Sequence, residues 1–153
     1  MMDRRLPKTL AALTTAVICS SGTAVAAPPS AQAALALKPV QADVDYELVP
    51  AESVANCQVR DLEVDGWSGW EVVAPDGSLL RRFADTNDDK KVDLWCYFNF
   101  GVEVYRDIDE NFNGKADQYR WLRTGGTRWG LDDDEDGRID RWKMISAEEV
   151  TAE

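Results

Sequence analysis

Three acidic stretches share one pattern and organise the second half of the sequence: DTNDDKKVDLW at residues 85–95, DENFNGKADQY at 109–119 and DDDEDGRIDRW at 132–142. Their starts lie 24 and 23 residues apart, so the chain contains an internal repeat. Each copy has Asp or Asn at positions 1, 3, 5 and 9, an apolar residue at position 8 and an aromatic residue at position 11. Glycine occupies position 6 in the second and third copies.

Short oxygen-bearing side chains at alternate positions of a tight loop suit a hard cation. Calcium takes about six to eight oxygen ligands, which alternate loop residues can aim at one centre. Glycine at position 6 permits a sharp turn because it reaches positive φ at little cost. The candidate ligands are, copy by copy, Asp85, Asn87, Asp89 and Asp93; Asp109, Asn111, Asn113 and Asp117; and Asp132, Asp134, Asp136 and Asp140.

These stretches resemble the Asp-rich calcium loops of EF-hands, dockerins, thrombospondin type 3 repeats and FG-GAP-type β-hairpins, over about 60 residues. The resemblance implies Ca²⁺ as the bound ion. An EF-hand has a bidentate Glu at position 12, where this chain has Cys96, Arg120 and Lys143. The closest resemblance is therefore to the β-hairpin loop, whose last ligand is the position-9 Asp. The chain from Cys57 onward is also similar to exported bacterial proteins, a similarity that implies no activity.

Ligand charge ranks the three loops. The third has four carboxylates, which would repel one another without a cation between them. The second has two Asp and two Asn and should bind more weakly, and the first has Lys90 in place of glycine and should be the weakest. The alternative is that all three are solvated turns, because Asp, Asn and Gly are also common turn formers.

The segments after the acidic stretches alternate with the period of a β-strand. This alternation puts one set of large side chains on a single face, where they are expected to form the core: Trp95, Tyr97, Tyr119, Trp121, Trp142 and Met144. Two further β-like runs flank a Pro75-Asp76-Gly77 turn and predict a hairpin. The expected fold is mainly β, an antiparallel meander of about seven short strands built from hairpin repeats of about 24 residues, with a short C-terminal helix.

The sequence predicts four regions along the chain. Residues 1–26 have a basic start, a short apolar run and an Ala24-Val25-Ala26 cleavage site, as in a secretory signal peptide; the apolar run is too short for a membrane anchor. Residues 27–55 lack a periodic apolar face and are expected to be a flexible linker or tail. Residues 56–145 form the predicted β-repeat calcium-loop domain. Residues 146–153 begin a helix, with Ser146 as its N-cap.

Charge and cysteine content narrow the function. Removing the signal peptide takes away Asp3 and three basic residues, so the formal net charge of the chain changes from −11 to −13. Such acidity argues against nucleic acid and anionic membranes as partners. After cleavage two cysteines remain, Cys57 and Cys96. An exported protein would pair them in a disulfide, and two buried free thiols are the alternative.

The expected protein is thus an exported, non-catalytic calcium-binding module in which the cation stabilises hairpin loops, without a membrane span once the signal is removed. It has no histidine, and its acidic pairs are accounted for by the loop period, which argues against an enzyme that uses paired carboxylates. Two alternatives stay open. One is a glycan- or protein-binding module that uses exposed Trp67, Trp70 or Trp129, and the other is a non-catalytic segment of a larger exported protein.

Overall fold

The computed structural model describes residues 28–64 and 66–146. The predicted signal peptide lies outside these residues. So does the predicted C-terminal helix apart from Ser146, which is the last residue of a strand.

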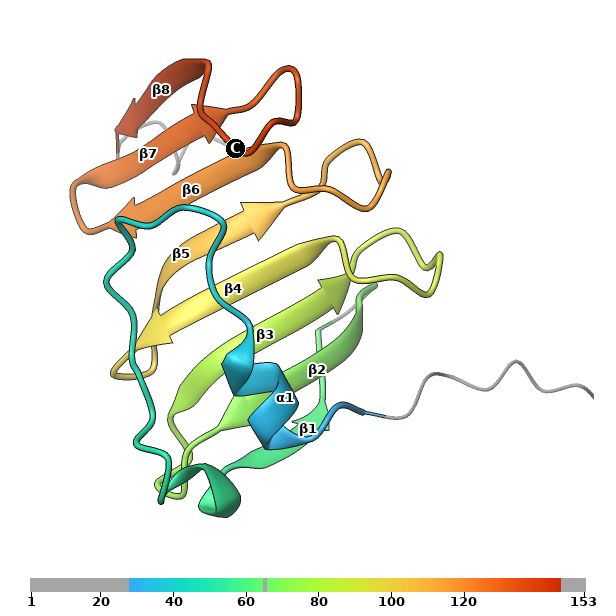
Figure 1. The fold of residues 1–153 in the computed structure, drawn as a ribbon, viewed down its shortest axis with the longest axis vertical. Helices are drawn as coiled ribbons and strands as arrows, with labels where there is room; N and C mark the ends of the chain where they lie inside the picture. The colour runs from blue at the N-terminus through green and yellow to red at the C-terminus, as the bar shows by residue number, and fades with distance from the viewer. Residues whose placement is uncertain (1–27, 65, 147–153) are drawn as a thin grey trace, which may run out of the picture.

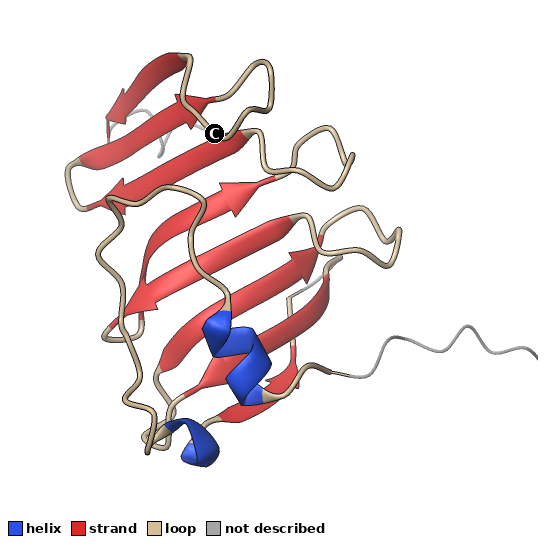
Figure 2. Cartoon of the chain, viewed as in Figure 1, coloured by secondary structure: helices blue, strands red, loops and turns tan. Residues whose placement is uncertain are grey.

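Eight antiparallel strands form one sheet, and strands that follow one another in sequence are neighbours in space (Figure 1). They are β1 (Gln58–Asp61), β2 (Ser68–Val73), β3 (Leu79–Asp85), β4 (Leu94–Asn99), β5 (Val102–Ile108), β6 (Gln118–Arg123), β7 (Gly126–Leu131) and β8 (Arg141–Ser146). The predicted antiparallel meander is confirmed, with eight strands in place of about seven (Figure 2). The additional strand is β1, whose sequence QVRD has no apolar alternation.

One face of the sheet carries the aromatic core. Along this face Phe83, Trp95, Asp107 and Tyr119 are successive cross-strand partners on β3 to β6. A second row contains Arg81, Tyr97, Tyr105 and Trp121, and the three aromatic side chains in it are buried.

The predicted core is wrong at its C-terminal end. Trp142 is 50% exposed and Met144 is 73% exposed, although both lie on the predicted face. They belong to β8, which pairs only with β7 among the described strands. An edge strand has neighbours on one side only, so its side chains lose half of their lateral contacts.

The segment predicted as a linker, residues 27–55, instead lies across the aromatic face from residue 28 onward (Figure 1). It contains α1 (Ala31–Ala36), whose Ala34 is buried against Val72 and Phe83, and it leads into the 3₁₀ turn η1 (Val54–Asn56). The Tyr46 ring lies 5.3 Å from the Tyr97 ring. Between α1 and η1 the segment crosses the sheet as an irregular strap, so its sequence has no sustained helical or strand periodicity although it buries apolar side chains.

The opposite face carries a row of charged side chains. On it Arg60, Glu71 and Arg82 are cross-strand partners, and both guanidinium groups donate hydrogen bonds to the Glu71 carboxylate at 2.7–3.0 Å. Burial alone would raise the pKa of Glu71, but the hydrogen bonds from Arg82 and Arg60 outweigh it and lower that pKa. The sheet therefore neutralises its buried acid on this face with flanking bases.

The predicted disulfide between Cys57 and Cys96 is wrong, because both residues are free thiols. Cys57 packs with Ala34 and Val72 on the aromatic face, whereas Cys96 packs with Ala84 and Leu94 on the other face. The sheet lies between the two sulfur atoms. The alternative of two buried thiols agrees with the structure.

Candidate metal centre

The three acidic stretches form hairpin loops at one end of the sheet (Figure 1). Loop 1 (residues 85–93) joins β3 to β4, loop 2 (109–117) joins β5 to β6, and loop 3 (132–140) joins β7 to β8. Each loop starts where a strand ends, so its first Asp is held by the sheet and is buried.

The three loops share one hydrogen-bond network, which begins at the position-1 Asp. In loop 3, Asp132 accepts the backbone N–H of Asp136 at 3.2 Å and of Gly137 at 2.9 Å. The equivalent donors are Asp89 and Lys90 to Asp85 in loop 1, and Asn113 and Gly114 to Asp109 in loop 2. The first Asp therefore folds each loop around its own side chain.

The other oxygen-bearing side chains repeat in the same way. The position-3 side chain accepts from the N–H of position 5, and the position-5 side chain accepts from the N–H of position 7. The position-9 Asp accepts from the N–H of position 2 and so closes the loop. The position-9 residues are Asp93, Asp117 and Asp140, and burial raises the pKa of Asp93 and Asp117.

The backbone reaches positive φ at positions 4 and 6 of every loop. In loop 3 these are Glu135 (57°) and Gly137 (87°). In loop 1 the position-6 residue is Lys90 at 74°, so a non-glycine residue holds the conformation that glycine adopts more easily. Loop 1 therefore has the same turn geometry as the other two loops because of its hydrogen bonds and not because of its residue at position 6.

The loops differ in how many carboxylates converge. In loop 3, Asp132, Asp134 and Asp136 each offer an oxygen, and these oxygens lie within 4.8 Å of one another. Asp132 is buried, whereas the other two are exposed. Within residues 28–64 and 66–146 no comparable group of three exists in loops 1 and 2. The predicted fourth ligand, Asp140, accepts the Asp133 N–H at 2.8 Å and lies outside the group.

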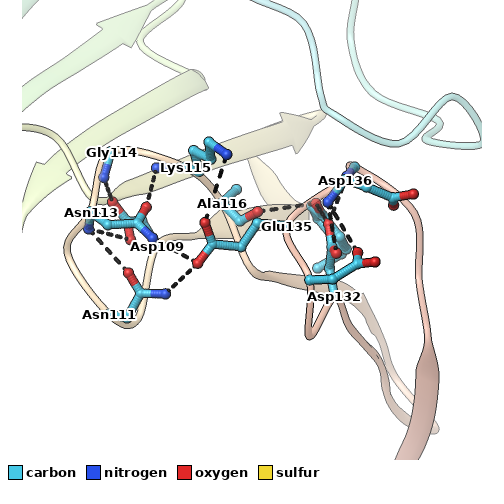
Figure 3. A network of polar contacts seen from close by, with 12 residues as sticks. Asp109, Asn111, Asn113, Gly114, Lys115, Ala116, Asp132, Glu135 and Asp136 are labelled. Carbon is cyan, nitrogen blue, oxygen red and sulfur yellow. Dashed lines mark hydrogen bonds and ion pairs between the residues drawn. The ribbon is translucent and has the colours of Figure 1, made fainter.

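A residue outside the predicted ligand set connects loop 2 to loop 3. Glu135, at position 4 of loop 3, accepts hydrogen bonds from the side-chain amides of Asn111 at 2.8 Å and Asn113 at 2.6 Å (Figure 3). Lys115 lies 3.9 Å from the same carboxylate. Because each amide donates through its nitrogen to Glu135, its oxygen is left for loop 2. The sequence signal for this bridge is only that position 4 differs between the loops, as Asp88, Phe112 and Glu135.

The loops are also tied to one another and to the core. The Asp109 N–H donates to the Asp93 carbonyl at 2.8 Å, and the Asp132 N–H donates to the Asp117 carbonyl at 3.0 Å. The last ligand position of one loop therefore contacts the first of the next. In addition, the buried Tyr119 hydroxyl donates to Asp132 at 2.9 Å.

The tryptophans expected to be exposed are not the exposed ones. Trp67, Trp70 and Trp129 are each half-buried, and Trp129 has the Arg120 guanidinium 4.2 Å and the Lys143 amine 4.6 Å from its ring centre. Trp142 is the exposed tryptophan, and Arg128 lies 4.4 Å from its ring. The Trp129 and Trp142 rings therefore stack on the protein's own cations.

Comparison of the chain with protein-family models, with curated proteins and with solved structures finds no match. Within the described residues, neither helix has the length and apolar character needed to cross a membrane.

Proposed function

We propose that this protein is an exported, non-catalytic module that binds Ca²⁺ in loop 3. The observation that carries the proposal is the convergence of oxygens from Asp132, Asp134 and Asp136 within 4.8 Å. Three carboxylates this close repel one another unless a cation lies between them. Arg138, 3.9 Å from Asp136, is the one basic group that pairs with them among the described residues.

The backbone N–H groups of the loop orient these carboxylates before any ion binds. Asp134 and Asp136 each use Oδ1 to accept a backbone N–H. Oδ2 of each side chain accepts none of these hydrogen bonds, and that of Asp136 has only the exposed Arg138 at 3.9 Å, which a cation would displace. Such pre-orientation reduces the conformational entropy lost on binding. The ligand set then resembles those that hold calcium in Asp-rich loops.

The chemistry of the site favours calcium over transition metals. All candidate ligands are hard oxygen donors, and the chain contains no histidine. Zinc and copper sites rely mainly on imidazole or thiolate ligands. Magnesium requires a near-ideal octahedron at about 2.0–2.1 Å, whereas calcium tolerates an irregular, partly hydrated site such as an exposed loop.

We expect the other two loops to bind more weakly. Loop 2 combines two carboxylates with the amide oxygens of Asn111 and Asn113, and loop 1 has Lys90 and Lys91 beside its ligands. A bound cation would fix the hairpin ends of the sheet and would raise the melting temperature by mass action.

Calorimetric titration of the purified protein with CaCl₂ and, separately, MgCl₂ tests the proposal. The matched variants are Asp136→Asn and Asp89→Asn, which occupy position 5 of loops 3 and 1. Asn keeps the oxygen that accepts the position-7 N–H and removes the charge. We expect Asp136→Asn to weaken the tightest calcium event by at least about tenfold, and Asp89→Asn to leave it unchanged. Absence of binding, together with an unmoved melting temperature at saturating calcium, would exclude the function.

A further inference from the structure

A cavity of about 450 Å³ lies on the aromatic face of the sheet, between the N-terminal strap and loops 2 and 3. This volume is within the range of small-molecule sites, about 300–1,000 Å³. Trp95, Tyr97 and Tyr119 supply aromatic walls from β4 and β6, and Val40 belongs to the strap. Asp107 also lines the cavity, from β5.

Asp107 is a buried carboxylate without a cationic partner. The residue is 2% exposed. Its carboxylate accepts hydrogen bonds from the Tyr105 hydroxyl at 2.5 Å and from the Val40 N–H at 3.1 Å. No Lys or Arg among the described residues forms an ion pair with it. A buried charge without a counter-ion is costly, in contrast to the paired Glu71 on the other face.

The walls around Asp107 are suited to a positive charge. Trp95 and Tyr119 are its direct cross-strand neighbours on β4 and β6, so a group placed over the carboxylate lies between two aromatic side chains. Aromatic faces attract cations through their negative electrostatic potential. The same layer already holds one, since the Arg81 guanidinium carbon lies 4.4 Å from the Tyr46 ring centre and 5.2 Å from that of Tyr97.

We propose that this cavity binds a small molecule that carries an alkylated ammonium group, with Asp107 as its counter-ion and Trp95 and Tyr119 as its walls. An alkylated ammonium is favoured over a metal ion because aromatic walls cannot replace a tightly bound hydration shell. At the rim, Lys38 and Lys115 balance Glu135 and Asp136, so the entrance has no net charge. The strap lines one side of the cavity through Leu37, Lys38 and Val40, which favours a free molecule over a headgroup in a bilayer.

Choline is a suitable probe because it has an uncharged isostere, 3,3-dimethylbutan-1-ol. Both are titrated calorimetrically into the full chain in the presence of EDTA, so the result does not depend on the proposed calcium site. We expect choline to bind saturably and the isostere to bind at least tenfold more weakly. Equal binding of the two, or no choline binding at millimolar concentration, would overturn the proposal without affecting the calcium function. Binding to phosphatidylcholine vesicles but not to free choline would also overturn it.

Two variants locate the site. Asp107→Asn removes the charge and keeps the shape, and it should weaken choline binding at least tenfold. Asp45→Asn removes one exposed negative charge from the strap and should leave choline affinity unchanged. Equal affinity of Asp107→Asn and the wild type would contradict the assignment. If Asp107→Asn does not fold, as judged by circular dichroism, the comparison of choline with its isostere on the wild type still decides the question.

Discussion

Loops 1 and 3 close equivalent hairpins with equivalent hydrogen bonds, yet they differ in what their side chains bring together. Both have a buried Asp at position 1 and positive φ at positions 4 and 6. Only loop 3, among the described residues, brings three carboxylate oxygens within 4.8 Å of one another. In loop 1, Lys90 pairs with Asp88 and Lys91 lies 3.9 Å from Asp89. The hydrogen-bond network therefore shapes the turn, whereas the remaining side chains decide whether the loop can hold a cation.

Replacing the position-1 Asp of loop 3 or loop 1 should change stability more than any other substitution considered, and it separates the shaping of the turn from the binding of the cation. Asp132 and Asp85 each accept two loop N–H groups and one hydroxyl, from Tyr119 and Ser68 respectively. Replacing either with Ala removes three hydrogen bonds, although the position-5 N–H keeps the position-3 side chain as an acceptor. At about 1 kcal/mol for each hydrogen bond, each variant should lose about 2–3 kcal/mol in free energy of unfolding without calcium. Urea denaturation measures this loss.

Calcium titration of the same two variants shows which of the two loops binds the ion. Asp132→Ala should abolish the tightest event, and Asp85→Ala should preserve it. If the two variants lost the same free energy of unfolding and the same calcium affinity, the two loops would not differ in function.

A smaller effect is expected at position 4, where loop 3 contacts its neighbour and loop 1 does not. Glu135→Gly removes the bridge to Asn111 and Asn113, whereas Asp88→Gly removes only an exposed pair with Lys90. Glycine relieves the positive φ at both sites, so backbone strain changes similarly. We expect Glu135→Gly to be about 1–2 kcal/mol less stable than Asp88→Gly, measured by urea denaturation. Equal values would indicate that the bridge contributes nothing to stability.

The smallest effect is expected from exchanging the position-6 residues. Lys90→Gly should stabilise the protein and Gly137→Lys should destabilise it, each by about 0.5 kcal/mol, because relief of left-handed strain is partly offset by the entropy of glycine in the unfolded chain. Thermal melts of the two variants measure the change. Gly137→Lys should weaken calcium binding without abolishing it, since its ligand oxygens are unchanged and one positive charge is added beside them. Complete loss of binding would show that the turn residue, and not the carboxylates, separates the loops.

The repeated features of the fold could be predicted from the sequence because they depend on local spacing. The 24- and 23-residue period and the strand alternation predicted the meander, and all three acidic stretches form hairpin loops. Among the described residues the cluster of three carboxylates lies in loop 3, the loop with the most acidic predicted ligand set.

The features that could not be predicted depend on contacts between distant segments. The strap over the aromatic face and the burial of Asp107 beneath it require the sheet to exist first. Glu135 occupies position 4, where the loop pattern requires no particular residue. Its role is revealed only by the short distance between loops 2 and 3 in the folded structure. The disulfide prediction failed because it used compartment and cysteine count, neither of which says on which face of a sheet a side chain lies.

The hydrogen bonds from Asp109 to Asp93 and from Asp132 to Asp117 connect each loop to the one before it, and this arrangement allows the chain to change in length by whole repeats. Each repeat adds one loop and two strands, and the next loop docks on the last residue of the previous one. Adding or removing an even number of antiparallel strands keeps the direction of the remaining strands. Duplicating or deleting one repeat of 23–24 residues therefore leaves each remaining strand with the same direction and the same side chains toward the core. Repeat arrays whose units contact only their neighbours lengthen and shorten in this way. The array could therefore gain or lose ion-binding loops by gene duplication or deletion without requiring a new core.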